Sequence, residues 1–286
     1  MNTALSQWRQ TLRSHAEFAA WHAANGAVLD DQWRPTIALQ AALRDAKASA
    51  SVPGYCWPCQ APSQFLYDLK YSNGRDVNWR ERLVCTRCGL NNRLRLTVQV
   101  IEAEGLRGRG YLTEHVTPLA RLLLERFPGL VTSEYLGPDH APGQVSRQGI
   151  RHEDLCHLSL AGGSMDFVIS CDVLEHIPDY PAALRELARV LVPGGLALLT
   201  APFLPHAADN LVRARLEGGR VVHLLEPEYH GDPVGAQEGV LCYYHFGWQL
   251  LEDLRRAGFA DAWLDLYWSA DYANLGGPQV FVMARR

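Results

Sequence analysis

The stretch from residue 166 to residue 203 constrains the fold of this chain more than any other segment. It opens with a short, almost continuously apolar run at 166–170, which is typical of a strand buried on both faces of a parallel sheet. Leucines and alanines then recur at helical spacing over 181–191, a Pro-Gly-Gly turn follows at 193–195, and a second apolar run occupies 196–200. This order predicts a right-handed strand, helix, strand crossover within an α/β sheet.

Both predicted strands are followed by side chains suited to binding and chemistry. In sheets of this kind, ligands bind outside the carboxyl ends of the strands. The residues expected at the mouth of such a cleft are Asp172, Glu175, His176, Pro202 and Phe203.

The sequence Asp-x-Leu-Glu-His-Ile from Asp172 to Ile177, with its following helix and Pro-Gly-Gly strand, carries a family resemblance. It is similar to the fourth and fifth strand region of class I S-adenosylmethionine (SAM) dependent methyltransferases. A weaker resemblance extends over roughly residues 106–286. It implies an α/β fold with a doubly wound, mostly parallel, seven-stranded Rossmann-like sheet, SAM as cofactor and methyl transfer as reaction.

The segment before this region has the pattern of the cofactor half of the sheet. A strand at 110–113 precedes a helix that begins at Pro118 with Thr117 as its N-cap, and a second strand at 130–133 ends in Glu134. An acid about twenty residues past the first turn can accept the hydroxyl groups of a ribose. The resemblance implies that Glu134 binds the SAM ribose. It also implies that an acid after the third strand meets the adenine amino group, and Asp154 is favoured there over its neighbour Glu153.

The loop after the first strand departs from the family pattern. Family members place a Gly-x-Gly-x-Gly sequence there, whereas residues 114–118 read Glu-His-Val-Thr-Pro and contain no glycine. Val116 is β-branched and resists a positive φ angle. We expect Glu114 and Thr117 to contact the ammonium and carboxylate groups of SAM, with Asp172 also on the cofactor side. The alternative is a tight helix start in a protein that does not bind SAM.

Two Cys-x-x-Cys pairs form the second informative feature. Cys56 and Cys59 are followed, after about twenty-five residues, by Cys85 and Cys88. This spacing is typical of a structural zinc site, because four thiolates complete a tetrahedron and leave no open position for chemistry. Reduced structural thiols or a redox pair are the alternatives.

Arginines crowd around the second pair, together with Trp79. They suggest three roles: docking of the zinc module through pairing with acids, a grip on an acidic substrate, or an RNA surface. Docking is favoured over RNA because the formal net charge of the chain is -4. The arginines are Arg80, Arg82, Arg87, Arg93 and Arg95.

A long insertion at 204–246 follows the fifth strand and is expected to overhang the reactive end of the cleft. An acceptor hydroxyl needs a base, and a neutral histidine suits that role near pH 7. A second metal site formed by His223, Glu226 and His230 is disfavoured, because Pro227 interrupts the helix that would align them. The catalytic candidates are His176, His206, His230 and His245, and the predicted walls of the acceptor pocket are Phe203, Tyr243, Tyr244 and Trp268.

The 286 residues suffice for one α/β core and an accessory module. Helices are expected at 4–24, ending at Asn25-Gly26, and from Pro35 to Ala48. The predicted organisation is a helical segment at 1–50, a four-cysteine zinc module at 51–100 and a SAM-dependent methyltransferase domain at 101–286. No apolar run reaches the roughly eighteen residues of a membrane span, and no signal core is evident at the N-terminus, so we expect a cytoplasmic protein.

Several functions fit these features. The leading one is methyl transfer to a small molecule such as a saccharide, a lipid-linked sugar or a secondary metabolite. An RNA methyltransferase that uses the arginine-rich module, a non-catalytic scaffold and a SAM-consuming enzyme that transfers no methyl group are the alternatives.

Overall fold

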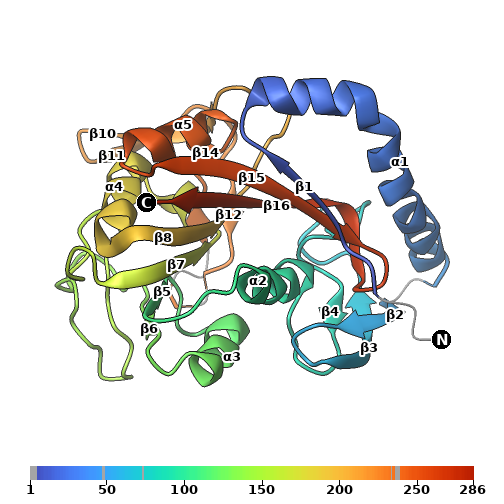
Figure 1. Ribbon diagram of the computed structural model, residues 1–286, viewed down its shortest axis with the longest axis horizontal. Helices are drawn as coiled ribbons and strands as arrows, with labels where there is room; N and C mark the ends of the chain where they lie inside the picture. Colours follow the sequence, from blue (N-terminus) through green and yellow to red (C-terminus); the bar gives the residue numbers. More distant parts are fainter. Residues whose placement is uncertain (1–4, 47–48, 73, 233, 236–238) are drawn as a thin grey trace. The chain divides into compact units, whose positions relative to one another are not determined.

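Figure 1 shows the computed structural model, which describes residues 5–46, 49–72, 74–232, 234–235 and 239–286. The chain forms two compact units. The first unit comprises the described parts of 1–11, 20–106 and 265–280, and the second comprises 12–19, 107–264 and 281–286. The predicted division at residues 50 and 100 stays a prediction.

The largest sheet has seven strands. Their order across the sheet is β1 (Trp8–Leu12), β15 (Asp261–Ser269), β16 (Asn274–Arg285), β8 (Leu191–Thr200), β7 (Met165–Cys171), β5 (Gly110–Leu112) and β6 (Val131–Thr132). Strand β5 is parallel to both β6 and β7, β7 is parallel to β8, and β16 is antiparallel to β8. The predicted fold class, a mostly parallel Rossmann-like sheet of seven strands, is confirmed.

The crossover from β7 to β8 has the predicted form. Helix α4 (Tyr180–Val190) begins where the Asp179 side chain accepts a hydrogen bond from the Ala182 amide at 3.1 Å. The chain returns through Gly194, whose φ of 82° suits a residue without a side chain. Residues from both strands and the helix form the core of the second unit, among them Phe167, Ile169, Leu187 and Leu198 at 0% exposure.

Residues 151–155, which include the two acids compared with the family's segment after the third strand, take part only in isolated bridges, one of them a parallel bridge between Glu134 and His152. The edge strand opposite β6 is β1, from the N-terminal segment.

The N-terminal helices were predicted correctly only in part, since residues 15–24 and 35–46 are helical but residues 8–12 are not. Residues 8–12 form strand β1, although they lie in the predicted helix 4–24, whose first residue is outside the described residues. Helix α1 (His15–Ala46) follows, and the predicted stop survives as non-helical backbone at Asn25, with φ -129° and ψ 15°. The helix then continues through Pro35, where a second helix was expected to begin, and residues 47–48 lie outside the described residues.

Strand β1 is held by polar contacts with a residue distant in the sequence, which the pattern of residues 8–12 does not predict. Asp265 of β15 is fully buried and accepts hydrogen bonds from Arg9 at 2.7 Å and from the Thr11 hydroxyl at 2.5 Å. These contacts join residues more than 250 positions apart. They favour extended backbone at 8–12 over the helix that local spacing favours.

The first unit contains a small antiparallel sheet and one further helix. The sheet has the order β2 (Ala50–Cys56), β3 (Ala61–Tyr67) and β4 (Val84–Cys85), and helix α2 spans Asn92–Ala103 (Figure 1). The Asn91 side chain caps α2 by accepting a hydrogen bond from the Leu94 amide at 2.9 Å.

The second unit contains the remaining elements. They are α3 (Pro118–Arg126), the 3₁₀ turn η1 (Leu174–His176), α5 (Gln249–Arg256), β9 (Leu211–Val212), β10 (Ala214–Glu217), β11 (Arg220–His223), β12 (Tyr229–His230), β13 (Val240–Leu241) and β14 (Tyr244–His245). Strands β9 to β14 belong to the predicted insertion and pair as β10 with β11, β12 with β13, and β14 with β9. Among the described residues, none of the helices is both long and apolar enough to cross a membrane.

Candidate functional site

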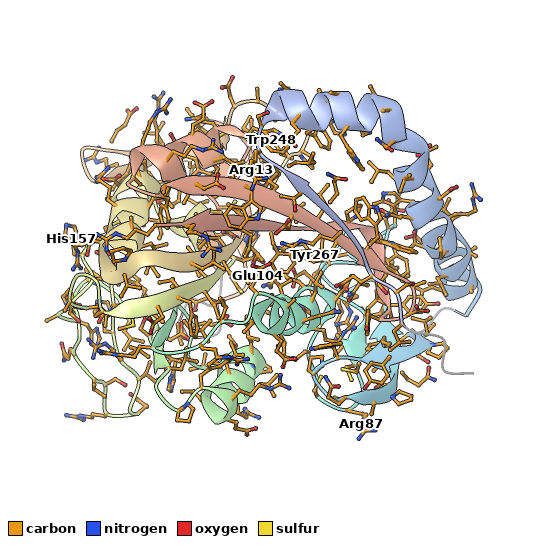
Figure 2. All side chains as sticks on the ribbon, viewed as in Figure 1. Arg13, Arg87, Glu104, His157, Trp248 and Tyr267 are labelled. Atoms are coloured by element: carbon orange, nitrogen blue, oxygen red, sulfur yellow. The ribbon has the colours of Figure 1, made fainter. Side chains whose placement is uncertain are left out.

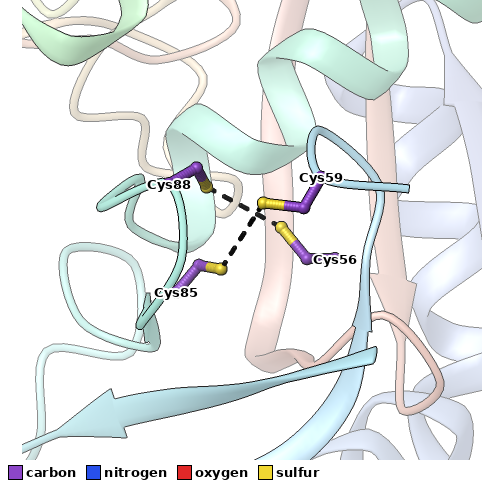
Figure 3. A group of neighbouring side chains, drawn as sticks. All are labelled: Cys56, Cys59, Cys85 and Cys88. Atoms are coloured by element: carbon purple, nitrogen blue, oxygen red, sulfur yellow. Dashed lines mark hydrogen bonds between the residues drawn. The ribbon is translucent and has the colours of Figure 1, made fainter. Parts of the chain in front are cut away.

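The four cysteines of the two Cys-x-x-Cys pairs come together in the first unit (Figure 3). Their sulfur atoms all lie within 4.8 Å of one another, with 3.8 Å between Cys56 and Cys88 and 3.9 Å between Cys59 and Cys85. A zinc ion bound to four thiolates at about 2.3 Å in a tetrahedron requires sulfur atoms about 3.8 Å apart. The cluster therefore fits the dimensions of a structural zinc site.

The surroundings of this cluster also suit thiolates. The Arg87 amide at 3.4 Å and the Ser63 hydroxyl at 3.1 Å lie within hydrogen-bonding distance of the Cys85 sulfur. Hydrogen bonding to Cys56 lowers the pKa of the Cys88 thiol below its ordinary value. The same hydrogen bond raises the pKa of Cys56, so these two sulfur atoms share a proton in the absence of a metal ion, which would displace it.

Arg95 of α2 is a buried cation in the same unit, with 2% exposure. Its guanidinium donates to the Tyr272 and Ala273 carbonyls at 2.6 and 2.9 Å and lies 4.1 Å from the centre of the Phe65 ring. Burial lowers its pKa to about 10, while the charges of the four cysteines act in the opposite direction. Arg95 therefore remains positive at neutral pH and offsets negative charge on the thiolates.

The other arginines near the second cysteine pair are mostly engaged. Arg80 and Arg93 each place a guanidinium nitrogen near a Glu81 carboxylate oxygen, at 2.6 and 3.1 Å. Arg82 pairs with Asp68 at 2.6 Å. Arg87 is exposed and projects away from the small sheet (Figure 2). The five arginines do not form one exposed stripe, and this weakens the RNA alternative.

On the cofactor side, Glu134 follows β6 and is 8% exposed. Its Oε1 atom accepts hydrogen bonds from the backbone amides of His115 and Val116, at 2.7 and 3.0 Å. No residue of the 114–118 loop has a positive φ. The Glu134 carboxylate thus fixes the conformation of the glycine-free loop, whose residues all have ordinary backbone angles.

Three more predicted cofactor residues flank these strands. Thr117 caps α3 as expected, accepting a hydrogen bond from the Ala120 amide at 3.1 Å, and Glu114 is half-buried. Asp172 follows β7, has a φ of 55°, and accepts a hydrogen bond from the Thr200 hydroxyl at 3.0 Å. A positive φ in a residue other than glycine is uncommon and is concentrated at functional sites.

The two acids weighed for adenine recognition differ in availability. Glu153 is 2% exposed and binds Arg151 at 2.7 Å and the Ser159 hydroxyl at 2.5 Å. The Asp154 side chain is 39% exposed, and its Oδ1 accepts one hydrogen bond, from the Cys156 amide at 2.8 Å. The structure therefore leaves Asp154, the favoured residue, the more accessible of the two.

Three of the four predicted catalytic histidines gather around two glutamates. Glu175 is 0% exposed, with its carboxylate 3.6 Å from His230 Nδ1 and 3.8 Å from His176 Nε2. The same two imidazole nitrogens are 3.2 Å apart. The Glu175 carboxylate, followed by Glu228, raises the pKa of His230 to about 9.

Glu228 connects the remaining members of this cluster. One of its carboxylate oxygens lies 3.0 Å from His230 Nε2 and 3.1 Å from His245 Nε2, and the other lies 3.2 Å from Arg213. Interactions with these partners outweigh the effect of burial and lower the pKa of Glu228. We call Glu175, His176, Arg213, Glu228, His230 and His245 the insertion cluster.

Elements distant in sequence create the insertion cluster. Glu175 and His176 lie on η1, directly after the β7 end, whereas His230 and His245 lie on β12 and β14. The backbone amide of Tyr243 donates to the Glu175 carbonyl at 2.7 Å. The role of Glu228 was missed from sequence because only the strand pairing of the insertion brings it to these histidines.

The remaining predicted site residues lie elsewhere. The His206 ring is exposed and contacts Phe18 at a centroid distance of 5.1 Å. His223 and Glu226 are exposed, and no helix includes them, so they do not join His230 in a helical metal motif.

The predicted acceptor-binding aromatics do not share one environment. Phe203 packs against Trp248, labelled in Figure 2, with ring centres 5.7 Å apart. Tyr243 is buried, and the Tyr244 hydroxyl donates to the Pro178 carbonyl at 2.7 Å. Trp268 packs against the hydrophobic core of the first unit, which contains Cys56 and Cys85. Their roles in binding stay predictions.

Comparisons with known proteins point to one family. A family model described as a methyltransferase domain matches residues 115–199. A probable SAM-dependent methyltransferase of Mycolicibacterium smegmatis is 34% identical over 95 residues, which are 33% of this chain and only 35% of that protein. The demethylmenaquinone methyltransferase of Thermus thermophilus is 30% identical over 164 residues, which are 53% of this chain and 67% of that enzyme.

Solved structures of methyltransferases also align with this chain. A SAM-dependent methyltransferase of Mesorhizobium loti aligns with 66% of this chain and 96% of its own, at 18% identity and a TM-score of 0.39. The similarity to the Thermus enzyme covers two thirds of that protein, and the chain belongs to the class I S-adenosylmethionine-dependent methyltransferases.

Proposed function

We propose that this protein transfers a methyl group from SAM to a small-molecule acceptor by in-line displacement, and that its four cysteines hold a structural zinc ion. The relative from Thermus thermophilus is named for a small-molecule acceptor, demethylmenaquinone, which supports this acceptor class. The paired and buried arginines of the first unit support it further, because they offer no continuous basic surface to RNA.

The observation that carries the proposal is the position of Glu134. Its carboxylate follows β6 and anchors the loop between β5 and α3 through the amides of His115 and Val116. This places an acid beside the first loop, at the carboxyl edge of the parallel strands, where a ribose would bind. Asp154 would bind the adenine amino group, and Glu114, Thr117 and Asp172 would contact the rest of the cofactor.

SAM supplies an electrophilic methyl group on a sulfonium sulfur. The protein must align the acceptor with that methyl group and exclude water, an orientation effect that can remove about 7 to 11 kcal/mol of barrier. The insertion cluster lies next to the β7 end and is our proposed contact for the acceptor. Phe203, Tyr243 and Tyr244 are the aromatic residues proposed to bind the acceptor nearby, and Trp268 and His206 are retained as weaker candidates.

Titration calorimetry with S-adenosylhomocysteine tests the cofactor assignment. We expect the full chain to bind this product and the Glu134→Gln variant to bind about 10-fold to 100-fold more weakly, because hydrogen bonds to a charged group contribute about 1.5 to 3 kcal/mol. Glu125→Gln, which changes an exposed glutamate of α3, is the matched control and should leave the affinity unchanged.

The absence of binding heat in the wild-type chain at several temperatures would contradict the proposal. Equal affinity in the wild type and the Glu134→Gln variant would remove Glu134 from the cofactor site. Transfer of tritiated methyl groups from SAM to demethylmenaquinone, with a tRNA pool as the competing acceptor, then tests the acceptor class.

A further inference from the structure

Glu175 is an unusual carboxylate within the insertion cluster. Its side chain is 0% exposed, and neither of its oxygens accepts a hydrogen bond from the described part of the chain. One of these oxygens lies 3.6 Å from His230 and 3.8 Å from His176. A buried carboxylate is costly unless a cation or a set of hydrogen bonds compensates its charge. The position of Glu175 therefore favours direct contact with a cation.

In each of the two histidines beside Glu175, the ring nitrogen on the far side from Glu175 lies close to a hydrogen-bond acceptor. His176 Nδ1 lies 2.8 Å from the Leu241 carbonyl, which can only accept a hydrogen bond, so the proton is on Nδ1 and Nε2 keeps its lone pair. His230 Nε2 lies 3.0 Å from Glu228, so this nitrogen can keep its proton and donate to the carboxylate while a metal ion displaces the proton of Nδ1. Metal-binding histidines usually have the second nitrogen held in this manner by a carbonyl or a carboxylate.

The spacing of the three groups suits a common ion. His176 Nε2 and His230 Nδ1 are 3.2 Å apart, and each lies 3.6 to 3.8 Å from a Glu175 oxygen. Nitrogen and oxygen ligands bind zinc at about 2.1 Å, which places two ligands of a tetrahedron about 3.4 Å apart. The three atoms already lie near these separations. They come from η1 and from β12, and the backbone amides of Tyr243 and Cys242 donate to the carbonyls of Glu175 and Glu228 beside them.

We propose that Glu175, His176 and His230 bind one divalent transition-metal ion, and that Glu228 orients His230 from outside the ligand set. Two imidazoles and one carboxylate suit zinc, manganese or iron(II) and leave at least one coordination position open. This site is separate from the four-cysteine cluster, which uses all its ligands on one ion. Arg213 pairs with Glu228 at 3.2 Å and balances its charge, and His245 Nε2 lies 3.1 Å from the same carboxylate.

An ion at this place would also specify the acceptor, an assignment that rests on the proposed methyl transfer. The open position would hold an oxygen atom of the acceptor, and a hydroxyl group bound there would lose its proton more readily. The acceptor class would then be hydroxyl compounds, with neighbouring oxygens that can chelate the ion. His245, which contacts Glu228 rather than Glu175, remains available to take up that proton.

Counting bound zinc tests the proposal on the full-length chain. The protein is equilibrated with micromolar Zn²⁺ in the absence of SAM, and zinc per chain is measured by plasma mass spectrometry. We expect about two ions in the wild type, because one closed cysteine site and one open site are present. Glu175→Gln and His230→Gln should each retain about one ion, the one held by the cysteines.

Two further variants sharpen this test. Glu228→Gln should retain the second ion at saturation but bind it about 10-fold to 100-fold more weakly, as expected for loss of an orienting carboxylate. His223→Gln changes an exposed histidine of β11 in the same insertion and should bind about two ions like the wild type.

A wild-type count of about one ion, lost in a Cys59→Ser variant, would overturn the proposal. A second ion that survives both Glu175→Gln and His230→Gln would overturn it as well. Retention of the cysteine-bound zinc and of S-adenosylhomocysteine binding shows that the variants are folded. Because the zinc count needs no SAM, failure of the metal site is distinguishable from failure of the proposed methyl transfer.

Discussion

Gly110, the first residue of β5, illustrates how tightly single residues are fixed in the second unit. A Cβ atom at this position would lie 2.2 Å from the Phe167 ring and 2.9 Å from a Leu130 methyl group. Phe167 is itself 0% exposed, so its ring has little room to move. The absence of a side chain at residue 110 is therefore a packing requirement of the sheet.

We expect Gly110→Ala to lower the free energy of unfolding by about 1 to 3 kcal/mol, because overpacking forces core side chains from their positions. Gly129→Ala is the matched control, since a Cβ atom there meets no heavy atom within 4 Å. Urea denaturation of both variants measures the difference. A Gly110→Ala protein as stable as the control would show that β5 can shift to accommodate the methyl group.

Arg95 gives a second prediction at this scale. Arg95→Met should weaken zinc retention against a competing chelator and destabilise the first unit by about 3 kcal/mol or more, since two buried carbonyls lose their donor. Arg95→Lys keeps the charge but loses the two-pronged donation, so we expect an intermediate effect. Chelator competition curves for the three proteins compare them, and identical curves would exclude a role of Arg95 beyond filling space.

At the scale of elements, local patterns predicted the fold where the contacts are local. The crossover from β7 through α4 to β8 was predicted correctly because burial, capping and the turn at 193–195 all lie within one segment. Strand β1 was missed because the residue that holds it, Asp265, is more than 250 positions away.

The candidate site divides in the same way. Glu134, Thr117 and the four cysteines follow from spacing along the chain, and the structure places them as such patterns suggest. The insertion cluster depends on the pairing of β12 with β13 and of β14 with β9, strands of two residues each with no periodic pattern. The histidines were therefore predicted as separate candidates, without the glutamates that join them.

Helix α4 offers a prediction on pH. Glu186 accepts hydrogen bonds from Arg189 at 2.6 Å and from the Leu158 amide at 2.8 Å, and Arg189 donates in turn to the Leu160 carbonyl at 2.9 Å. The hydrogen bond from Arg189 lowers the pKa of Glu186. Because the pKa is lower in the folded state, this stabilisation is present above the unfolded pKa of about 4.3 and is lost as the pH falls through the folded value.

Accordingly, Glu186→Gln should lower the free energy of unfolding by about 1 to 2 kcal/mol at pH 7, and the difference should shrink as the pH falls below about 4. Glu252→Gln removes a glutamate that also pairs with an arginine, but its side chain is 63% exposed, so it should change stability by no more than about 0.5 kcal/mol. Denaturation at several pH values tests both, and a pH-independent loss in Glu186→Gln would argue against the charge as its cause.

At the scale of the whole molecule, we expect the proposed zinc ion at the cysteines to contribute to stability. The four cysteines belong to the hydrophobic core of the first unit or pack against it, and a structural zinc ion contributes on the order of 10 kcal/mol in small modules. Cys59→Ser should lower the melting temperature by about 5 °C or more. Cys156→Ser, in the second unit, should not, because a serine hydroxyl can still donate to the Asp179 carbonyl. Equal melting temperatures of the two variants would show that the cluster is not a structural metal site.

The anchoring of the first loop by Glu134 has a consequence for how this protein can vary. Positions 115 and 116 keep ordinary backbone angles and donate their amides to Glu134. The His115 ring also lies 2.8 Å from the Thr132 hydroxyl, whereas most side chains except proline should be tolerated at position 116. Position 134, by contrast, combines loop shape with the proposed ribose recognition in one carboxylate. Random mutagenesis selected for cofactor binding should therefore return glutamate at position 134 and a range of residues at position 116.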